Sequence, residues 1–274
     1  MLPDLTVLPL YVWVGLAALL GLVLGSFAGV VVYRLPRMIE EDEPFNLCFP
    51  ASHCALCKHP LRWWHNIPVL SYVLLRGRCA FCAKRIGRSH VLIELAFAAL
   101  WALLVARLGP GLPALVWGGF FSVLLVLAVI DAQTLLLPDA LTWPLGLAGL
   151  CLSGLQLTGV SGWNALAAAV LAYGLLAAVA SLFERCCGVT AMGGGDPKLM
   201  AALGAWLGLE ALLPLLLLSS LLHIALSLVL TGGRKGQEVP FGPGMALAAT
   251  LYWACREQPW MQMLGASLGP AMGL

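Results

Sequence analysis

The sequence is short of charge. Only 10% of its 274 residues are Asp, Glu, Lys or Arg, whereas an average soluble domain has about 25%. The formal net charge is only +2, and the chain has no basic stripe of the kind that binds nucleic acid. These shortages argue against a soluble domain and against a nucleic-acid partner. Because 61% of the residues are hydrophobic, the composition favours a protein whose main solvent is lipid.

Long apolar runs fill most of the chain, and a helix of about 20 apolar residues crosses a hydrocarbon core of about 30 Å. We therefore predict an all-α polytopic membrane protein with about eight transmembrane helices. The expected helices are residues 9–33, 91–108, 112–130, 141–158, 163–183, 197–212, 213–231 and 242–257. The first run begins with Asp4 rather than a basic segment, so we expect it to remain as a helix and not to be removed as a signal peptide.

Positive charge concentrates in one segment. Nine of the fifteen Lys and Arg residues lie within residues 34–90, and loops rich in basic residues face the cytoplasm. The sequence thus predicts a first transmembrane helix at 1–33, a cytoplasmic loop module at 34–90 and a transmembrane helix bundle at 91–274. Membrane lipids are the expected surroundings of the first and last of these.

Two cysteine pairs lie in the cytoplasmic segment. Cys54-x2-Cys57 is followed after 21 residues by Cys79-x2-Cys82, and two such pairs bind Zn²⁺ tetrahedrally in zinc ribbons. Four sulfur ligands leave no open position for water, so we expect a structural Zn²⁺. Disulfides are the alternative, which a reducing cytoplasm disfavours. Four histidines could replace a ligand but are interpreted as exposed loop residues: His53, His59, His65 and His90.

Two aspartates stand at the ends of apolar runs. Asp131 directly follows Leu127-Ala-Val-Ile, and Asp196 follows three glycines, 193–195. The expected topology puts both at one membrane face. When two carboxylates lie close together, one keeps its proton while the other accepts one from water, which is what peptide hydrolysis needs. Glycines beside Asp196 would admit an extended substrate strand. The pair predicts an intramembrane aspartic protease.

Simpler interpretations exist for each acidic or titratable residue. Asp131 could be a helix-end charge that reaches headgroup water, and Asp196 could be a helix N-cap, although Asp139 is the better capping candidate. His223, alone in an apolar run, is interpreted as hydrogen-bonded to a neighbouring helix. Glu94 lies near enough to the cytoplasmic face to bear on substrate binding.

Two other classes of function use similar features. A proton-coupled transporter or channel could use the aspartates as a relay, although the sequence has no paired broken helices or repeated halves. A non-catalytic assembly factor could bind a partner through the zinc module, and it would tolerate loss of both aspartates but not of the cysteines.

Several motifs resemble those of the type IV prepilin peptidase family. They cover nearly the whole chain in the family's order: Gly25-Ser26-Phe27, Tyr33-Arg34-Leu35-Pro36, Cys54-x2-Cys57, Leu61-x-Trp63, Asn66-Ile67-Pro68, Gly77-x-Cys79-x2-Cys82, Leu137-Pro138-Asp139, Gly193 to Lys198 and Pro240-Phe241-Gly242-Pro243. One stretch departs from the pattern, because Ser89-His90-Val91 stands where the family commonly has Arg-Tyr-Pro.

The resemblance implies cleavage of a basic leader after a glycine, at the cytoplasmic face of a bacterial inner membrane. The implied substrates are type IV prepilins or type II secretion pseudopilins. Asp131 and Asp196 match the family's catalytic pair, and the four cysteines match its loop tetrad. The resemblance also implies S-adenosylmethionine-dependent N-methylation of the new amino terminus. The sequence assigns no residues to that cosubstrate and no oligomeric state to the protein.

Overall fold

A computed structural model describes residues 8–40, 46–54, 56–188, 192–231 and 239–256. These described residues form helices and no β-strand. The chain divides into two compact units, residues 1–122 and 123–274, with the boundary inside a helix.

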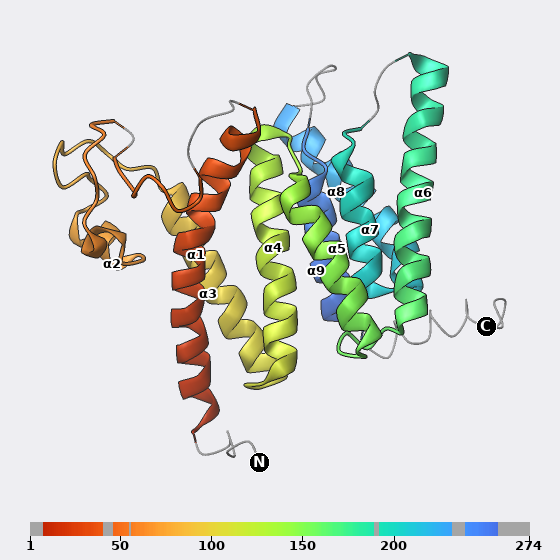
Figure 1. Cartoon of the computed structure of the whole chain (residues 1–274), viewed down its shortest axis with the longest axis horizontal. Coiled ribbons are helices and arrows are strands. Elements are labelled where there is room, and N and C mark those ends of the chain that lie inside the picture. Colours follow the sequence, from red (N-terminus) through yellow and green to blue (C-terminus); the bar gives the residue numbers. More distant parts are fainter. Residues whose placement is uncertain (1–7, 41–45, 55, 189–191, 232–238, 257–274) are drawn as a thin grey trace. The chain divides into compact units, whose positions relative to one another are not determined.

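The first unit is built on two long helices. These are α1 (Leu10–Glu40) and α3 (Ser89–Leu108), and α4 (Leu112–Thr134) begins in this unit. α1 and α3 cross each other (Figure 1). A Cβ atom on Gly25 of α1 would lie 2.7 Å from the Cα atom of Glu94 on α3. Glycine is therefore required where the two backbones approach, as at many membrane helix interfaces.

The segment between α1 and α3 contains little regular structure. It includes a short 3-10 helix, η2 (Trp63–Asn66), and α2 (Leu70–Leu74). Arg34, which is buried near the end of α1, donates hydrogen bonds to the backbone oxygens of Asn46 and Pro50 at 2.9 and 2.7 Å. This side chain therefore ties the start of the loop segment to the helix.

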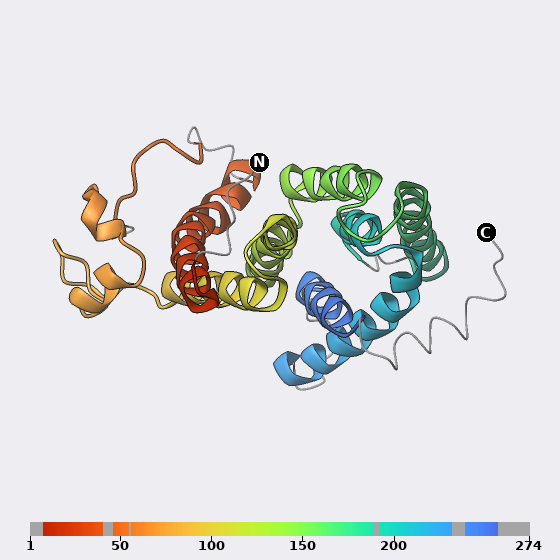
Figure 2. The ribbon, with the colours of Figure 1, turned by 90° about the horizontal axis from the view of Figure 1, so that it is seen from below.

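The second unit is a helical bundle around α7. Its helices are α5 (Asp139–Gly154), α6 (Gly162–Cys187), α7 (Gly195–Leu207), α8 (Leu209–Thr231) and α9 (Gly242–Cys255). Ten of the thirteen residues of α7 are buried, so this helix is the core. The indole of Trp206 donates to the Leu145 carbonyl of α5 at 2.8 Å, and Gly204 lies against the Ala168 backbone of α6. α7 thus packs against both helices (Figure 1 and Figure 2).

Each of the eight expected segments contains a helix among the described residues, although 141–158 is helical only as far as Gly154 and 197–212 is interrupted at Gly208. Five helices, α1, α3, α4, α6 and α8, are long and apolar enough to cross a membrane. α5, α7 and α9 have 16, 13 and 14 residues, or about 20–24 Å at 1.5 Å per residue, which is less than the hydrocarbon thickness. The fold is that of a multi-pass membrane protein, while the count of eight spans stays a prediction.

Several predicted helix boundaries were wrong. α1 continues to Glu40 instead of ending at residue 33, and α6 continues to Cys187 instead of ending at residue 183. We expected the break between the sixth and seventh helices at residues 212–213, near Pro214. The structure ends α7 at Leu207 because Gly208 takes a φ of +81°, which glycine adopts readily. Pro214 lies inside α8 instead, in the second turn of that helix.

Candidate functional site

Asp131 lies in the last turn of α4 and belongs to the second unit. Its side chain is 4% exposed. The Oδ2 atom accepts a hydrogen bond of 2.7 Å from the backbone N–H of Gly242, the first residue of α9. A Cβ atom at position 242 would lie 2.7 Å from the same oxygen. Glycine is therefore needed at this position to let the backbone donor reach the carboxylate.

Asp196 is the second residue of α7, also in the second unit, and is 8% exposed. Its backbone N–H donates to the Gly193 carbonyl at 3.3 Å. A Cβ atom on Gly195 would lie 2.6 Å from the Cβ of Leu137, so this glycine lets α7 begin against the segment that follows α4. The N-cap of α7 is Gly194 without a side-chain cap, so the interpretation of Asp196 as an N-cap was wrong.

The two carboxylates lie close enough to repel each other electrostatically. They reach this position from opposite ends of their helices, Asp131 from the last turn of α4 and Asp196 from the first turn of α7. Both side chains are buried. The residues that sequence reasoning paired are therefore both buried within one unit, near enough to interact electrostatically.

The backbone beside Asp196 is accessible. Gly193 and Gly194 are exposed, and nothing lies within 4 Å of the place where a Cβ of Gly194 would stand. A Cβ on Gly193 would approach Asp196 Oδ2 to 3.8 Å. An extended peptide could therefore pair with this backbone without meeting side chains.

Lys198 was not singled out from the sequence. Its Nζ atom contacts both carboxylate oxygens of Asp139, at 2.6 and 2.8 Å. This ion pair joins the first turn of α5 to the first turn of α7, two residues from Asp196. The expectation that Asp139 caps its helix was wrong, because Pro138 is the N-cap and Asp139 lies in the first turn. The sequence offered one signal for Lys198, which is its position two residues after the candidate catalytic residue Asp196.

His223 on α8 faces Phe241, with ring centroids 5.1 Å apart in an edge-on arrangement. Its Nδ1 atom is buried and has no hydrogen-bond partner among the described residues. The expected hydrogen bond to a neighbouring helix is therefore not made at this nitrogen.

The four predicted metal ligands come together in the first unit. The sulfurs of Cys54, Cys57, Cys79 and Cys82 all lie within 4.8 Å of one another, and those of Cys54 and Cys82 are 3.9 Å apart. Zn–S bonds of about 2.3 Å in a tetrahedron put sulfurs about 3.8 Å apart. The thiols are free, which is against the disulfide alternative. The geometry fits a tetrahedral metal ion.

The two Cys-x2-Cys turns have the same local structure. In the first turn, the Cys54 N–H donates to the His59 carbonyl, and the Lys58 N–H donates to the Cys54 carbonyl. In the second turn, Cys79 and Lys84 repeat the first of these bonds, and the residue after each pair has a φ near +57°. Backbone N–H groups of Cys57 and Leu56 lower the pKa of the Cys54 thiol to about 6. A thiolate is the form that binds metal.

Two of the histidines near this cluster contact an aromatic ring. His59 stacks on Phe81, with ring centroids 3.7 Å apart, and His65 meets the same ring edge-on at 5.6 Å. Among the described residues, the four cysteines are the one group of metal-binding side chains.

Two family models match the chain. Residues 19–108 match the Bacterial Peptidase A24 N-terminal domain, and residues 119–228 match the Type IV leader peptidase family. No solved structure matches the chain.

Curated proteins similar to the chain carry one name, prepilin leader peptidase/N-methyltransferase. The protein of Burkholderia pseudomallei (strain 1026b) is 42% identical over 94% of this chain and 90% of its own length. That of Klebsiella pneumoniae is 46% identical over 80% of this chain and 96% of its own length. That of Neisseria gonorrhoeae is 38% identical over 94% of this chain and 95% of its own length.

Proposed function

The chain belongs to the type IV leader peptidase family, and we propose that it cleaves the basic leader of type IV prepilins or type II secretion pseudopilins and N-methylates the new amino terminus. The cleavage follows a glycine at the cytoplasmic face of a bacterial inner membrane. The concentration of Lys and Arg in residues 34–90 supports this orientation.

Asp131 and Asp196 are the proposed catalytic pair. The single observation that carries this assignment is the burial of two mutually repelling carboxylates in one unit. The N–H of Gly242 stabilises negative charge on Asp131, so Asp131 is suited to take a proton from the attacking water. Asp196, whose carboxylate lies beside it, is suited to hold a proton toward the peptide carbonyl.

The glycine backbone before Asp196 is the proposed binding edge for the substrate. Gly193 and Gly194 are exposed, and their backbone N–H groups could donate hydrogen bonds to an extended leader segment. Because glycine has no side chain beyond a hydrogen atom, no side chain of these residues stands between the leader segment and the Asp196 carboxylate. The scissile bond would then lie against the pair.

The four cysteines are the proposed ligands of a structural Zn²⁺. Their sulfur separations fit the ion, and a segment of this size has too small a core to fold firmly without such a cross-link. Four thiolates would complete the coordination, so this metal would not touch the substrate.

The test is a cleavage assay with detergent-purified protein and a synthetic prepilin peptide, read by mass spectrometry with and without S-adenosylmethionine. We expect cleavage after glycine, and an added methyl mass only with the cosubstrate. Asp196→Ala should give neither the cleaved peptide nor its methylated form. The control is Glu184→Gln, which changes an exposed acid at the end of α6 and should cleave as the wild type does. An intact peptide with folded wild-type protein would favour a transporter or an assembly factor.

A further inference from the structure

The first unit contains a cavity of about 620 Å³ whose lining includes neither Asp131 nor Asp196. Its walls come from α1, from the start of α3 and from the cysteine-containing segment between them. Small-molecule sites typically measure about 300–1,000 Å³. The cavity is therefore large enough for one small molecule rather than for a few waters.

Glycines on α1 keep this cavity open. A Cβ atom on Gly29 would lie 3.3 Å from the Nδ1 atom of His90, and one on Gly25 would meet the Glu94 backbone. Both glycines line the cavity. A larger side chain at position 29 would enter the space that a ligand needs.

Glu94 places a buried carboxylate in the cavity wall. The residue is 8% exposed, and its Oε2 atom accepts a hydrogen bond of 2.7 Å from the Val69 N–H. The Oε1 atom has no hydrogen-bond partner among the described residues. This oxygen is not among the buried polar atoms that lack a partner, so it is accessible from the cavity and suited to a ligand that brings a hydroxyl group or a positive charge.

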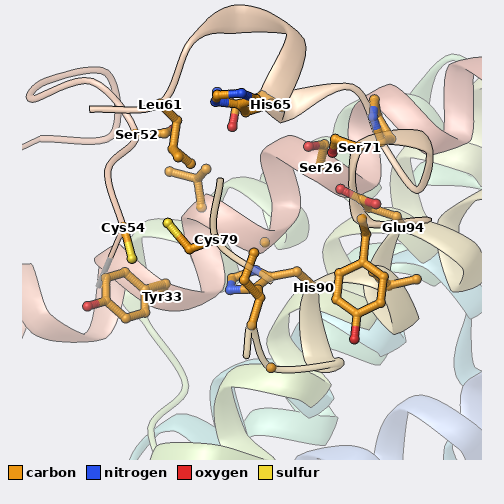
Figure 3. Close-up of a pocket in the computed structure, with 18 of the residues that line it drawn as sticks. Ser26, Tyr33, Ser52, Cys54, Leu61, His65, Ser71, Cys79, His90 and Glu94 are labelled. Atoms are coloured by element: carbon orange, nitrogen blue, oxygen red, sulfur yellow. The ribbon is translucent and has the colours of Figure 1, made fainter. Parts of the chain in front are cut away.

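The cavity lining is chemically mixed. Figure 3 shows Glu94 on the same side as Ser26 and Ser71, with Cys54 and Cys79 on the other side. The lining also includes the cations Lys84 and Arg85 and the aromatic rings of Tyr33 and Tyr72. A fitting ligand therefore has a cationic or hydroxyl-bearing part, a carboxylate and a flat apolar part.

We propose that this cavity binds S-adenosylmethionine, with Glu94 as a binding residue. The inference rests on the proposed methyltransferase function. The Glu94 carboxylate would face the ribose hydroxyls and the positively charged sulfonium, Lys84 and Arg85 would face the α-carboxylate, and the rings would flank the adenine. A strongly basic leader peptide fits less well, because Lys84 and Arg85 would repel it.

The methyl transfer itself needs no other reactant. The lone pair of the new amino terminus forms a bond to the methyl carbon while the carbon–sulfur bond breaks, and its electrons stay on sulfur. The products are S-adenosylhomocysteine and a methylated amine, which loses one proton to water.

The experiment measures equilibrium binding of radiolabelled S-adenosylmethionine to the detergent-purified full chain. Glu94→Gln keeps the shape and removes the charge, and we expect binding at least about tenfold weaker, since a hydrogen bond to a charged group contributes about 1.5–3 kcal/mol. Gly29→Leu should block binding by filling the cavity. Gly15→Leu is the matched control on the same helix, because nothing lies within 4 Å of that position.

Each outcome bears on a different claim. Wild-type protein that cleaves a prepilin peptide but neither binds nor uses S-adenosylmethionine would remove the methyltransferase function and this site with it. Wild-type protein that methylates, with Glu94→Gln and Gly29→Leu binding the cosubstrate equally well, would overturn the site alone. Weaker leader binding in both variants with unchanged S-adenosylmethionine binding would make the cavity a leader site. Elution profile and thermal unfolding midpoint identify a variant that has simply failed to fold.

Discussion

The cysteine cluster and the aspartate pair are assembled by contacts of opposite range. Each Cys-x2-Cys turn is closed by backbone hydrogen bonds between residues at most five apart, such as Cys54 to His59. The carboxylate of Asp131 is held by Gly242, which is 111 residues away. The cysteine cluster therefore depends on two local turns and on the metal ion proposed to join them. The aspartate pair depends on the packing of α4, α7 and α9. The two regions should respond differently to the same kind of damage.

The largest effect should come from removing either acid of the pair. Asp131→Asn or Asp196→Asn keeps the side-chain shape but removes the carboxylate, and cleavage of a prepilin peptide should fall by about 10³-fold or more. The loss should appear in kcat. Full activity in either variant would exclude that residue from the chemistry, and the thermal unfolding midpoint should change little.

A methyl group on Gly242 should damage the pair without touching either acid. The new Cβ of Gly242→Ala would lie 2.7 Å from Asp131 Oδ2, so the carboxylate or α9 must shift, and a displacement of about 1 Å can lower a rate by about 10²-fold. Gly174→Ala on α6 is the matched control, because nothing lies within 4 Å of its position. Equal cleavage rates in the two variants would refute the role of this contact.

Metal removal should affect the other region. A strong chelator should release one equivalent of Zn²⁺ and make residues 56–88 sensitive to limited proteolysis, because the two turns would lose the ion that joins them. Cys54 and Cys79 also line the cavity, so S-adenosylmethionine binding should weaken too. Hydrogen exchange in α7 should be unchanged, and increased exchange there would show that the two regions are not independent.

The smallest effect should come from the ion pair between α5 and α7. The Asp139 side chain is 56% exposed and that of Lys198 is 28% exposed, and exposed ion pairs contribute about 0–1 kcal/mol. Lys198→Met should therefore lower cleavage by no more than about fivefold. Asp139→Asn should have the same effect, and the double variant no further effect. A loss as large as that of Gly242→Ala would mean that Lys198 acts on the substrate directly.

Residue type and spacing in the sequence indicated both proposed sites. Cys-x2-Cys spacing is a local geometric constraint, so the cluster could be expected from it. Hydrophobic runs fix helix positions, and each of the eight expected segments contains a helix among the described residues. The pairing of Asp131 with Asp196 followed from topology rather than from contacts.

The rest depended on packing that spacing does not encode. The break at Gly208 was missed because the sequence marks the boundary around Glu210 to Pro214 poorly, and Pro214 lies within α8. Gly242 as the donor to Asp131, Lys198 as the partner of Asp139 and the cavity around Glu94 each join residues distant in the chain. No periodic pattern marks such contacts.

The most direct test of the account is a double-mutant cycle on the pair. The cleavage rates of Asp131→Asn, Asp196→Asn and the double variant are measured with one prepilin peptide. Because two acids that share one water act as a unit, the double variant should be no slower than the slower single variant. If the two losses multiply instead, the aspartates act independently and the shared catalytic site is wrong.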